Sequence, residues 1–229
     1  MKLLNLLLIA SIASSWVCAK EKFFVVEREN ESLATIYNGV KRANITGMHD
    51  MNHGVVKFDG KDGYAISRDG FVVKFDPESE KILAEYKTSK SAIGFVIGAN
   101  YVAVANYDDK SVDILDRDLK PLEKIQTGSK NVGIKTYENY LIFSQMENDT
   151  ISVFKDMNEG KNKPDFKLFK EFKDAGELPF DAMIKDEKYI VGFFTSKFFG
   201  VLDLKKMEYK KIDIFLDENR QMVLKVPHF

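Results

Sequence analysis

The residues of this sequence that could do chemistry are few, and most of them gather in residues 49–76. This stretch holds two of the three histidines, His49 and His53, and an Arg68-Asp69-Gly70 tripeptide between two apolar segments. An imidazole titrates near neutral pH and can ligate a metal. A guanidinium offers a fork of donors that suits a carboxylate better than an ammonium does. Together, histidine and arginine could bind an anionic ligand and supply a metal ligand or a proton-transfer group. However, histidines in loops and arginines in turns are also common as ordinary surface residues.

Motifs for nucleophilic, hydrolytic or phosphate chemistry are absent from the sequence. It has no Gly-x-Ser-x-Gly elbow, no phosphate-binding loop and no His-Glu-x-x-His. Cys18 is the single cysteine, so neither a zinc pattern nor a Cys-x-x-Cys-His heme attachment is present. The 34 basic and 35 acidic residues nearly balance, which argues against a nucleic-acid partner. A binding function remains, with catalysis undecided.

The N-terminal residues predict export. Lys2 precedes a short apolar run over residues 3–16, and Val17, Cys18 and Ala19 fit a small-x-small cleavage site. The run is short for a permanent membrane helix, so cleavage after Ala19 is preferred over an uncleaved anchor. Lipidation of Cys18 is the minority alternative, because the residue before it is not small.

The expected division is therefore a signal peptide over residues 1–19 and one domain over residues 20–229. No transmembrane segment is expected after cleavage. The mature chain would contain no cysteine, so its stability would depend on its core rather than on disulfides.

An internal repeat organises the rest of the chain. A tyrosine opens a short apolar segment four times, at Tyr64, Tyr101, Tyr140 and Tyr189. The copies lie about 40 residues apart, and the last interval is longer because it contains the polar insertion 158–164. Repeats of this length with several short strands are typical of β-propeller blades.

Each unit contains short segments of strand composition, rich in β-branched and aromatic residues and bounded by Gly, Asp, Asn or Ser. In the first three units they are 54–58, 64–67, 72–76 and 82–86; 92–97, 101–104, 112–116 and 122–125; and 132–135, 140–143, 151–154 and 166–169. Glycines at 60, 63 and 70 supply the positive φ of tight hairpins. No window shows helical periodicity. We predict an all-β propeller of four-stranded blades, with a β-sandwich as the alternative.

The count of units raises a question about closure. Residues 22–47 have the pattern of a partial blade, and residues 53–215 hold four units. An unclosed propeller would expose an apolar blade face and free strand edges. We therefore expect a C-terminally truncated part of a longer propeller, with a five-bladed ring as the alternative.

The segment 53–76, HGVVKFDGKDGYAISRDGFVVKFD, resembles the signature of the heme d1 domain of cytochrome cd1 nitrite reductase. It resembles even more the periplasmic propellers of heme d1 biosynthesis. In that superfamily a His opens the first strand and Gly-Arg-Asp-Gly closes the second, whereas Ser67 stands here in place of the first glycine. Three further pieces are similar to family segments: Asn106-Tyr107 with strand 111–116, the stretch 129–133, and Pro227-His228. The family propeller has eight blades, which agrees with the expected truncation.

The resemblance implies a role for each matching position. His53 would be the axial ligand to the heme iron, or a group that faces the macrocycle. Arg68 would hold a carboxylate of the tetrapyrrole, with Lys130 as a second candidate. The remaining three positions would line the pocket: Asn106, Tyr107 and His228. Histidine does not recur where the next units begin, near Ala92, Val132 and Phe180, so His53 would mark a ligand-binding blade.

The resemblance also implies a function. The chain would be a periplasmic protein that binds heme d1 or its precursor late in heme d1 biosynthesis, for use in denitrification. Its partners would be the tetrapyrrole and other heme d1 biosynthesis proteins or nitrite reductase. If a tetrapyrrole-modifying step occurs, His53 would serve as proton donor or acceptor. The alternative is a non-catalytic exported propeller that binds a protein or peptide through its loops, which needs neither heme nor His53.

Overall fold

The computed structural model describes residues 21–159, 161 and 163–213. The predicted signal peptide, residues 1–19, and the candidate His228 lie outside the described residues. Over the residues that are described, no helix is long and apolar enough to cross a membrane.

The described residues form five antiparallel sheets, in each of which strands consecutive in sequence are neighbours. The first sheet has three strands: β1 (Lys22–Glu27), β2 (Ser32–Tyr37) and β3 (Val40–Thr46). The next two have four strands each: β4 (Val55–Asp59), β5 (Asp62–Ile66), β6 (Phe71–Asp76) and β7 (Lys81–Lys87); then β8 (Ala92–Ile97), β9 (Tyr101–Asn106), β10 (Ser111–Asp116) and β11 (Pro121–Gln126).

The last two sheets also have four strands each: β12 (Asn131–Tyr137), β13 (Tyr140–Gln145), β14 (Thr150–Asp156) and β15 (Phe166–Phe172); then β16 (Pro179–Lys185), β17 (Lys188–Phe193), β18 (Phe198–Asp203) and β19 (Glu208–Asp213). Two short 3-10 turns interrupt the strands: η1 (Met51–His53) and η2 (Met146–Asn148). The described part of the chain has no α-helix.

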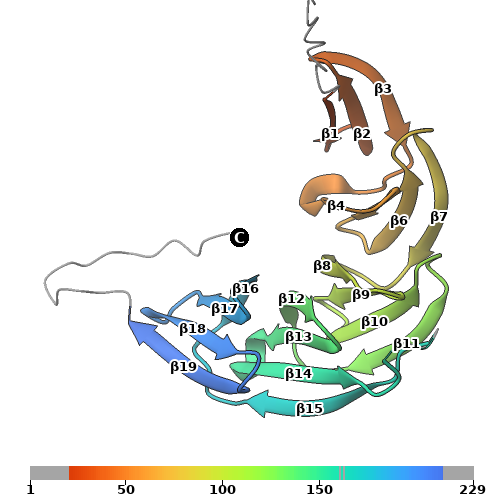
Figure 1. Cartoon of the computed structure of the whole chain (residues 1–229). Helices are drawn as coiled ribbons and strands as arrows, with labels where there is room; N and C mark the ends of the chain where they lie inside the picture. Colours follow the sequence, from red (N-terminus) through yellow and green to blue (C-terminus); the bar gives the residue numbers. More distant parts are fainter. Residues whose placement is uncertain (1–20, 160, 162, 214–229) are drawn as a thin grey trace, which may run out of the picture.

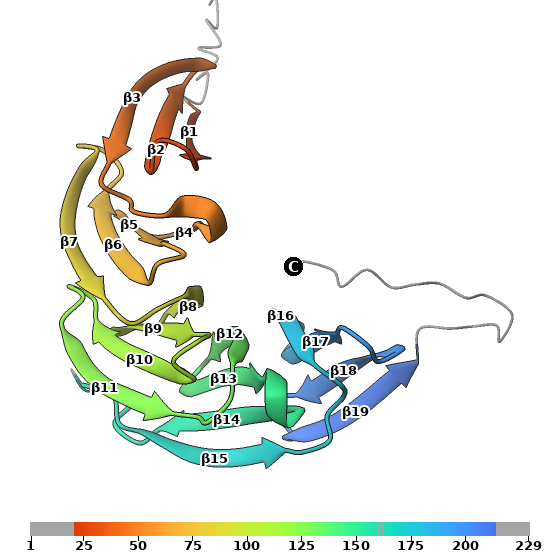
Figure 2. The ribbon, with the colours of Figure 1, turned by 180° about the vertical axis from the view of Figure 1, so that it is seen from behind.

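The sheets are the blades of a β-propeller, which confirms the predicted fold. They stand side by side along an arc (Figure 1), with β4, β8, β12 and β16 on its inner side and β7, β11, β15 and β19 on its outer side. The view from behind shows the same order (Figure 2). In both views the first and last sheets are not neighbours, so these five sheets alone do not make a five-bladed ring.

The repeated tyrosines explain part of the blade-to-blade packing. Tyr101 on β9 shares a 2.7 Å hydrogen bond with the Thr136 hydroxyl on β12. Tyr189 on β17 donates to the carbonyl oxygen of Gly133 on β12 at 2.8 Å. Both bonds join neighbouring sheets. Burial raises the pKa of Tyr101 to about 12, so its hydroxyl stays protonated at neutral pH. A buried hydroxyl without a partner would be destabilising, and for Tyr101 and Tyr189 a neighbouring blade supplies that partner.

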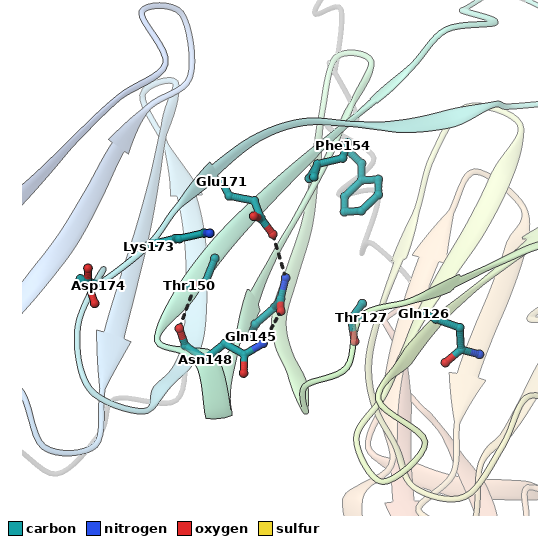
Figure 3. Close-up of a pocket in the computed structure, with 10 residues that line it drawn as sticks. Gln126, Thr127, Gln145, Asn148, Thr150, Phe154, Glu171, Lys173 and Asp174 are labelled. Carbon is teal, nitrogen blue, oxygen red and sulfur yellow. Dashed lines mark hydrogen bonds between the residues drawn. The ribbon is translucent and has the colours of Figure 1, made fainter.

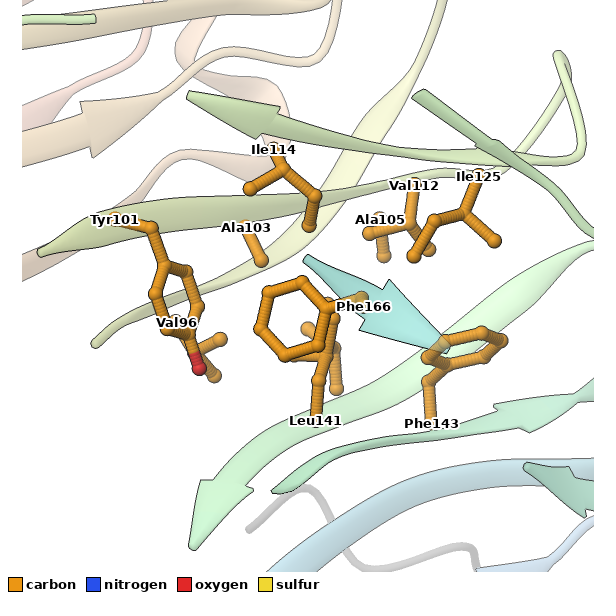
Figure 4. Packing of buried hydrophobic residues seen from close by; sticks show 11 residues of the cluster. Val96, Tyr101, Ala103, Ala105, Val112, Ile114, Ile125, Leu141, Phe143 and Phe166 are labelled. Atoms are coloured by element: carbon orange, nitrogen blue, oxygen red, sulfur yellow. The ribbon is translucent and has the colours of Figure 1, made fainter. Parts of the chain in front are cut away.

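Apolar side chains fill the seams between the blades. One fully enclosed cluster lies between the sheets β8–β11 and β12–β15 (Figure 4). In it the rings of Tyr101 and Phe166 meet edge to face, with centroids 5.1 Å apart and planes at 81°. Phe143 lies at the other end of the cluster and is completely buried. Because each of the three middle blades packs against a neighbour on both sides, the seams hold the inner strands in place.

The turn between β5 and β6 shows why this stretch is rich in small residues. The Ser67 hydroxyl accepts from the Phe71 N–H at 2.9 Å and donates to Asp69 Oδ1 at 2.6 Å. Ser67, which departs from the family pattern, therefore closes the turn with its own side chain. Gly70 has φ of +93°, and its carbonyl oxygen accepts from the Thr88 N–H at 3.0 Å.

Replacing Gly70 by alanine is expected to lower the free energy of unfolding by about 2–4 kcal/mol, through positive-φ strain and a clash. An alanine Cβ would lie 1.7 Å from the Ser89 carbonyl oxygen. Gly60→Ala is the control, because Gly60 has φ of +58° but an alanine Cβ there would meet no atom within 4 Å, so it should lose only about 1 kcal/mol. Urea denaturation measures both, and equal losses would contradict the close-packing argument.

Candidate functional site

The inner strands enclose a cavity of about 320 Å³. It is lined by His53, Val55 and Lys57 at β4, Ile93, Gly94 and Phe95 at β8, Val132, Gly133, Ile134 and Lys135 at β12, and Phe180 and Asp181 at β16. Most of the wall is therefore apolar, and the few polar groups come from three different blades. We call this the funnel cavity.

His53 is held at one end of the funnel cavity by the turn η1. The Asp50 carboxylate accepts from the Asn52 N–H at 3.0 Å, and the Gly54 N–H donates to the Met51 carbonyl oxygen at 3.0 Å. Met51 is fully buried, which anchors the turn, whereas the His53 side chain is exposed. The backbone thus fixes the position of an imidazole whose ring remains accessible to a ligand.

Arg68 connects this turn to the next blade. Its backbone N–H donates to the Asp50 carbonyl oxygen at 2.6 Å. Its guanidinium donates to the hydroxyl of Ser91, a buried residue just before β8. Arg68 therefore lies at the same end of the blades as His53, half-buried, and the guanidinium keeps donors beyond the one that Ser91 uses.

Tyr107 and Lys130 lie at the same end of the blades as His53 and Arg68. The Tyr107 N–H donates to the Ser91 carbonyl oxygen at 2.9 Å. The Lys130 ammonium lies 4.8 Å from the centroid of the Tyr107 ring, in a cation–π contact. Ser91 thus joins Arg68 to Tyr107, and Tyr107 joins Lys130. The structure brings these three predicted residues together across three blades, at the rim beside the funnel cavity rather than in its lining.

Asn106 lies inside its own sheet. It is fully buried, and its amide donates to Asp113 Oδ2 at 2.7 Å and to Ser111 Oγ at 3.2 Å. Burial raises the pKa of Asp113, which the Asn106 hydrogen bond opposes. Asn106 therefore supports the turn that carries Tyr107, and a direct contact with a ligand stays a prediction.

Lys57, Lys135 and Asp181 line the funnel cavity but were not predicted from the sequence. The Lys135 ammonium lies 3.7 Å from Asp181 Oδ1. The Lys57 ammonium lies 4.9 Å from the centroid of the Phe95 ring and donates to the Phe95 carbonyl oxygen. Lys57 could have been found, because it follows Val55 on β4 at the spacing of two that puts side chains on one face of a strand. Lys135 could not, because a bulge at Gly133, with φ of +59°, shifts the alternation in β12.

The Lys57 ammonium should make the stability of the protein depend on pH. Burial, together with the charge of Lys135, lowers the pKa of Lys57 from 10.5 to about 8. The folded state therefore binds fewer protons than the unfolded state between these values, and the penalty of the charged amine is fully present below pH 8. Lys57→Met should raise the melting temperature at pH 7 and lose this advantage as the pH rises toward 10.5. Melting curves of both proteins at the two pH values test this, and a constant difference would contradict it.

His49, the other histidine of this stretch, does not line the funnel cavity. Its ring stacks on Phe71 with centroids 3.6 Å apart, and its Nε2 lies 3.2 Å from Glu85 Oε2. These contacts attach the loop before β4 to β6 and β7. His49 is therefore a structural residue and a matched control for His53.

A second hollow, of about 500 Å³, lies at the seam of the sheets β8–β11 and β12–β15, and Figure 3 shows its polar side chains. The Gln145 amide donates to Glu171 at 3.5 Å, and the Asn148 amide donates to Gln145 at 3.0 Å. Several of its polar groups, among them Gln145, Asn148 and Glu171, bond to one another. None of the predicted site residues lines it, so the funnel cavity is the better candidate site.

The structure is a β-propeller whose inner strands wall an apolar cavity with a few polar groups, the usual form of a small-molecule site. The family model of the cytochrome D1 heme domain matches residues 18–222. The chain belongs to this family. No curated protein matches the sequence.

Solved structures agree on the fold. The dihydro-heme d1 dehydrogenase NirN in complex with DHE matches with a TM-score of 0.71 and 19% identity, over 84% of this chain and 44% of that chain. A functionally unknown protein from Desulfotomaculum acetoxidans matches with a TM-score of 0.66 and 15% identity, over 83% of this chain and 65% of its own. The designed Ika8 protein matches with a TM-score of 0.63 and 12% identity, over 81% and 56%. The chain spans less than two thirds of each of these proteins.

Proposed function

We propose that this chain is a periplasmic protein that binds heme d1 or a heme d1 precursor and acts late in heme d1 biosynthesis for nitrite reductase. Membership in the cytochrome D1 heme domain family is the observation that carries the proposal. The fold is also shared with NirN, whose structure contains DHE. The partners we propose are the tetrapyrrole and other heme d1 biosynthesis proteins or nitrite reductase.

The residues around the funnel cavity fit such a ligand chemically. Side chains such as Val55, Ile93 and Phe180 offer an apolar wall to a macrocycle. Cations stand at the rim and inside, and a tetrapyrrole with several carboxylates needs them. No three His, Cys, Asp or Glu side chains of the described residues could hold a metal ion alone. A single imidazole suffices for an iron that a macrocycle already holds, and bound iron tetrapyrrole would supply axial coordination and redox chemistry.

The roles follow from where the residues lie. We propose His53 as the axial ligand, since its turn is anchored while its ring remains exposed. Arg68 and Lys130 would hold carboxylates at the rim, beside Tyr107. If the bound group is also modified, the His53 imidazole can hold or release a proton near neutral pH.

The test is a titration of the purified chain with heme d1 and, separately, with its precursor. We expect a shifted Soret band that saturates at one ligand per chain, with a difference in affinity that identifies the preferred ligand. Absence of any shift with both compounds would overturn the proposal and favour the protein-binding alternative. Serum albumin in place of the chain controls for unspecific binding of an apolar ligand.

A further inference from the structure

Two lysines separate the funnel cavity from a second hollow beneath it. This lower cavity, of about 380 Å³, is lined by Lys57, Phe58, Asp59, Val96, Ile97, Lys135, Thr136 and Ile184. Only Lys57 and Lys135 line both cavities. His53 ends the turn η1 just before β4, and Lys57 is the third residue of β4, further along the inner strand. The lysines therefore form the floor of the funnel cavity, opposite the rim that carries His53.

The floor carries an excess of positive charge. Lys135 has Asp181 as its ion-pair partner, at 3.7 Å. The Lys57 ammonium contacts a carbonyl oxygen and an aromatic ring, both from Phe95, and neither group carries a full negative charge. Asp59, at the lower cavity, already forms an ion pair with Arg117, whose guanidinium lies 2.6 Å from Asp59 Oδ2.

Partial burial of two ammonium groups against one carboxylate is unfavourable without a further anion. The pKa values of both lysines reflect this, since burial lowers each of them. A lysine that only packed against its neighbours or kept the chain soluble would not need to line the funnel cavity. The combination of cavity, excess charge and free donor sites on the ammonium groups describes an anion-binding site.

We propose that Lys57 and Lys135 form a carboxylate-binding site at the floor of the funnel cavity, distinct from the rim residues Arg68 and Lys130. The carboxylate could be borne by the bound tetrapyrrole, in which case the inference rests on the proposed function, or belong to a small free acid. The recognition chemistry is the same for both sources: one carboxylate between two ammonium groups, in an apolar surrounding.

Binding of a free carboxylate can be tested without any tetrapyrrole. The lysines of the full chain are labelled by reductive ¹³C-methylation, and the signals of Lys57 and Lys135 are assigned with Lys57→Met and Lys135→Met. We expect acetate to raise the pKa of Lys57, while that of Lys74, which pairs with Asp118 at 2.9 Å far from the cavity, stays unchanged. The acetate affinity should fall about tenfold between pH 7 and pH 9, as Lys57 loses its proton. An unchanged Lys57 pKa with acetate would overturn the site.

The second arm identifies the source of the carboxylate. Iron mesoporphyrin and its dimethyl ester have the same ring, and only the first has free carboxylates. A preference of the wild type for the diacid that falls about tenfold in Lys57→Met but not in Lys57→Arg would assign the carboxylate to the tetrapyrrole. If acetate binds and the wild type has equal affinity for iron mesoporphyrin and its dimethyl ester, the carboxylate belongs to a small free acid. Failure of heme d1, its precursor and both mesoporphyrins to bind, with the acetate response intact, would reject the proposed function and leave this site standing.

Discussion

Phe143→Ala is expected to lower the free energy of unfolding by about 3–5 kcal/mol, because it removes a fully buried ring from a seam between blades. The ring belongs to the cluster that joins the sheets β8–β11 and β12–β15 (Figure 4). It also stacks on Phe154, with centroids 5.4 Å apart and planes at 20°. An alanine there leaves a cavity in contact with both sheets, which the rigid strands cannot fill.

Phe169→Ala is the matched control for this prediction. Phe169 is on the outer strand β15 and is 48% exposed, so its loss should lower the free energy by about 1 kcal/mol or less. Guanidinium denaturation and melting curves of the three proteins give the comparison, with a drop of about 10 °C expected for Phe143→Ala. Similar losses in the two variants would mean that the blade seams do not carry the stability of the fold.

The architecture could be predicted because a propeller repeats its signals. The tyrosines at 64, 101, 140 and 189 recur in phase, and in the structure they lie in the second strand of each four-stranded blade. Strand 92–97 was predicted with the bounds that the structure gives to β8. β8, with the sequence AIGFVI, is an unbroken apolar run, and the ends of such a segment are easy to locate.

The outer strands were harder to predict for a physical reason. The predicted segment 166–169 is shorter than β15, which continues to Phe172, because its exposed face carries lysine and glutamate. For the last blade neither β16 nor β19 was delimited. β19, with the sequence EYKKID, has almost no apolar residue to place on a buried face. β19 is an edge strand with five of its six residues exposed, so polar side chains can occupy most of its positions.

The candidate site likewise has a part that the sequence could indicate and a part that only the structure reveals. His53 and Arg68 could be named from their types and from the resemblance, and their link through Asp50 required coordinates. At the floor of the funnel cavity, alternation along β4 could have indicated Lys57, but nothing local marks Lys57 and Lys135 as a pair in a lysine-rich chain. Their importance comes from the positions of β4 and β12 around one cavity, a long-range relation that no local pattern encodes.

His53→Ala is expected to weaken binding of heme d1 or its precursor by about 100-fold and to remove the spectral signature of imidazole ligation. The imidazole is the one predicted site side chain that lines the funnel cavity among the described residues. The substitution should leave the fold intact, because Met51 and the Asp50 cap hold the turn without the ring. Soret titrations measure the affinity, and circular dichroism verifies that the variant remains folded.

The control and the rescue make this prediction specific. His49→Ala removes a histidine four residues away that stacks on Phe71 and contacts Glu85, so it should lower stability by about 1 kcal/mol or less and leave the Soret band unchanged. Free imidazole should enter the space vacated in His53→Ala and restore the wild-type spectrum, which a loss caused by misfolding would not allow. If His53→Ala binds like the wild type, or if His49→Ala abolishes the shift instead, the iron ligand has been assigned to the wrong residue. The rim around Arg68 would then have to hold the tetrapyrrole through its carboxylates alone.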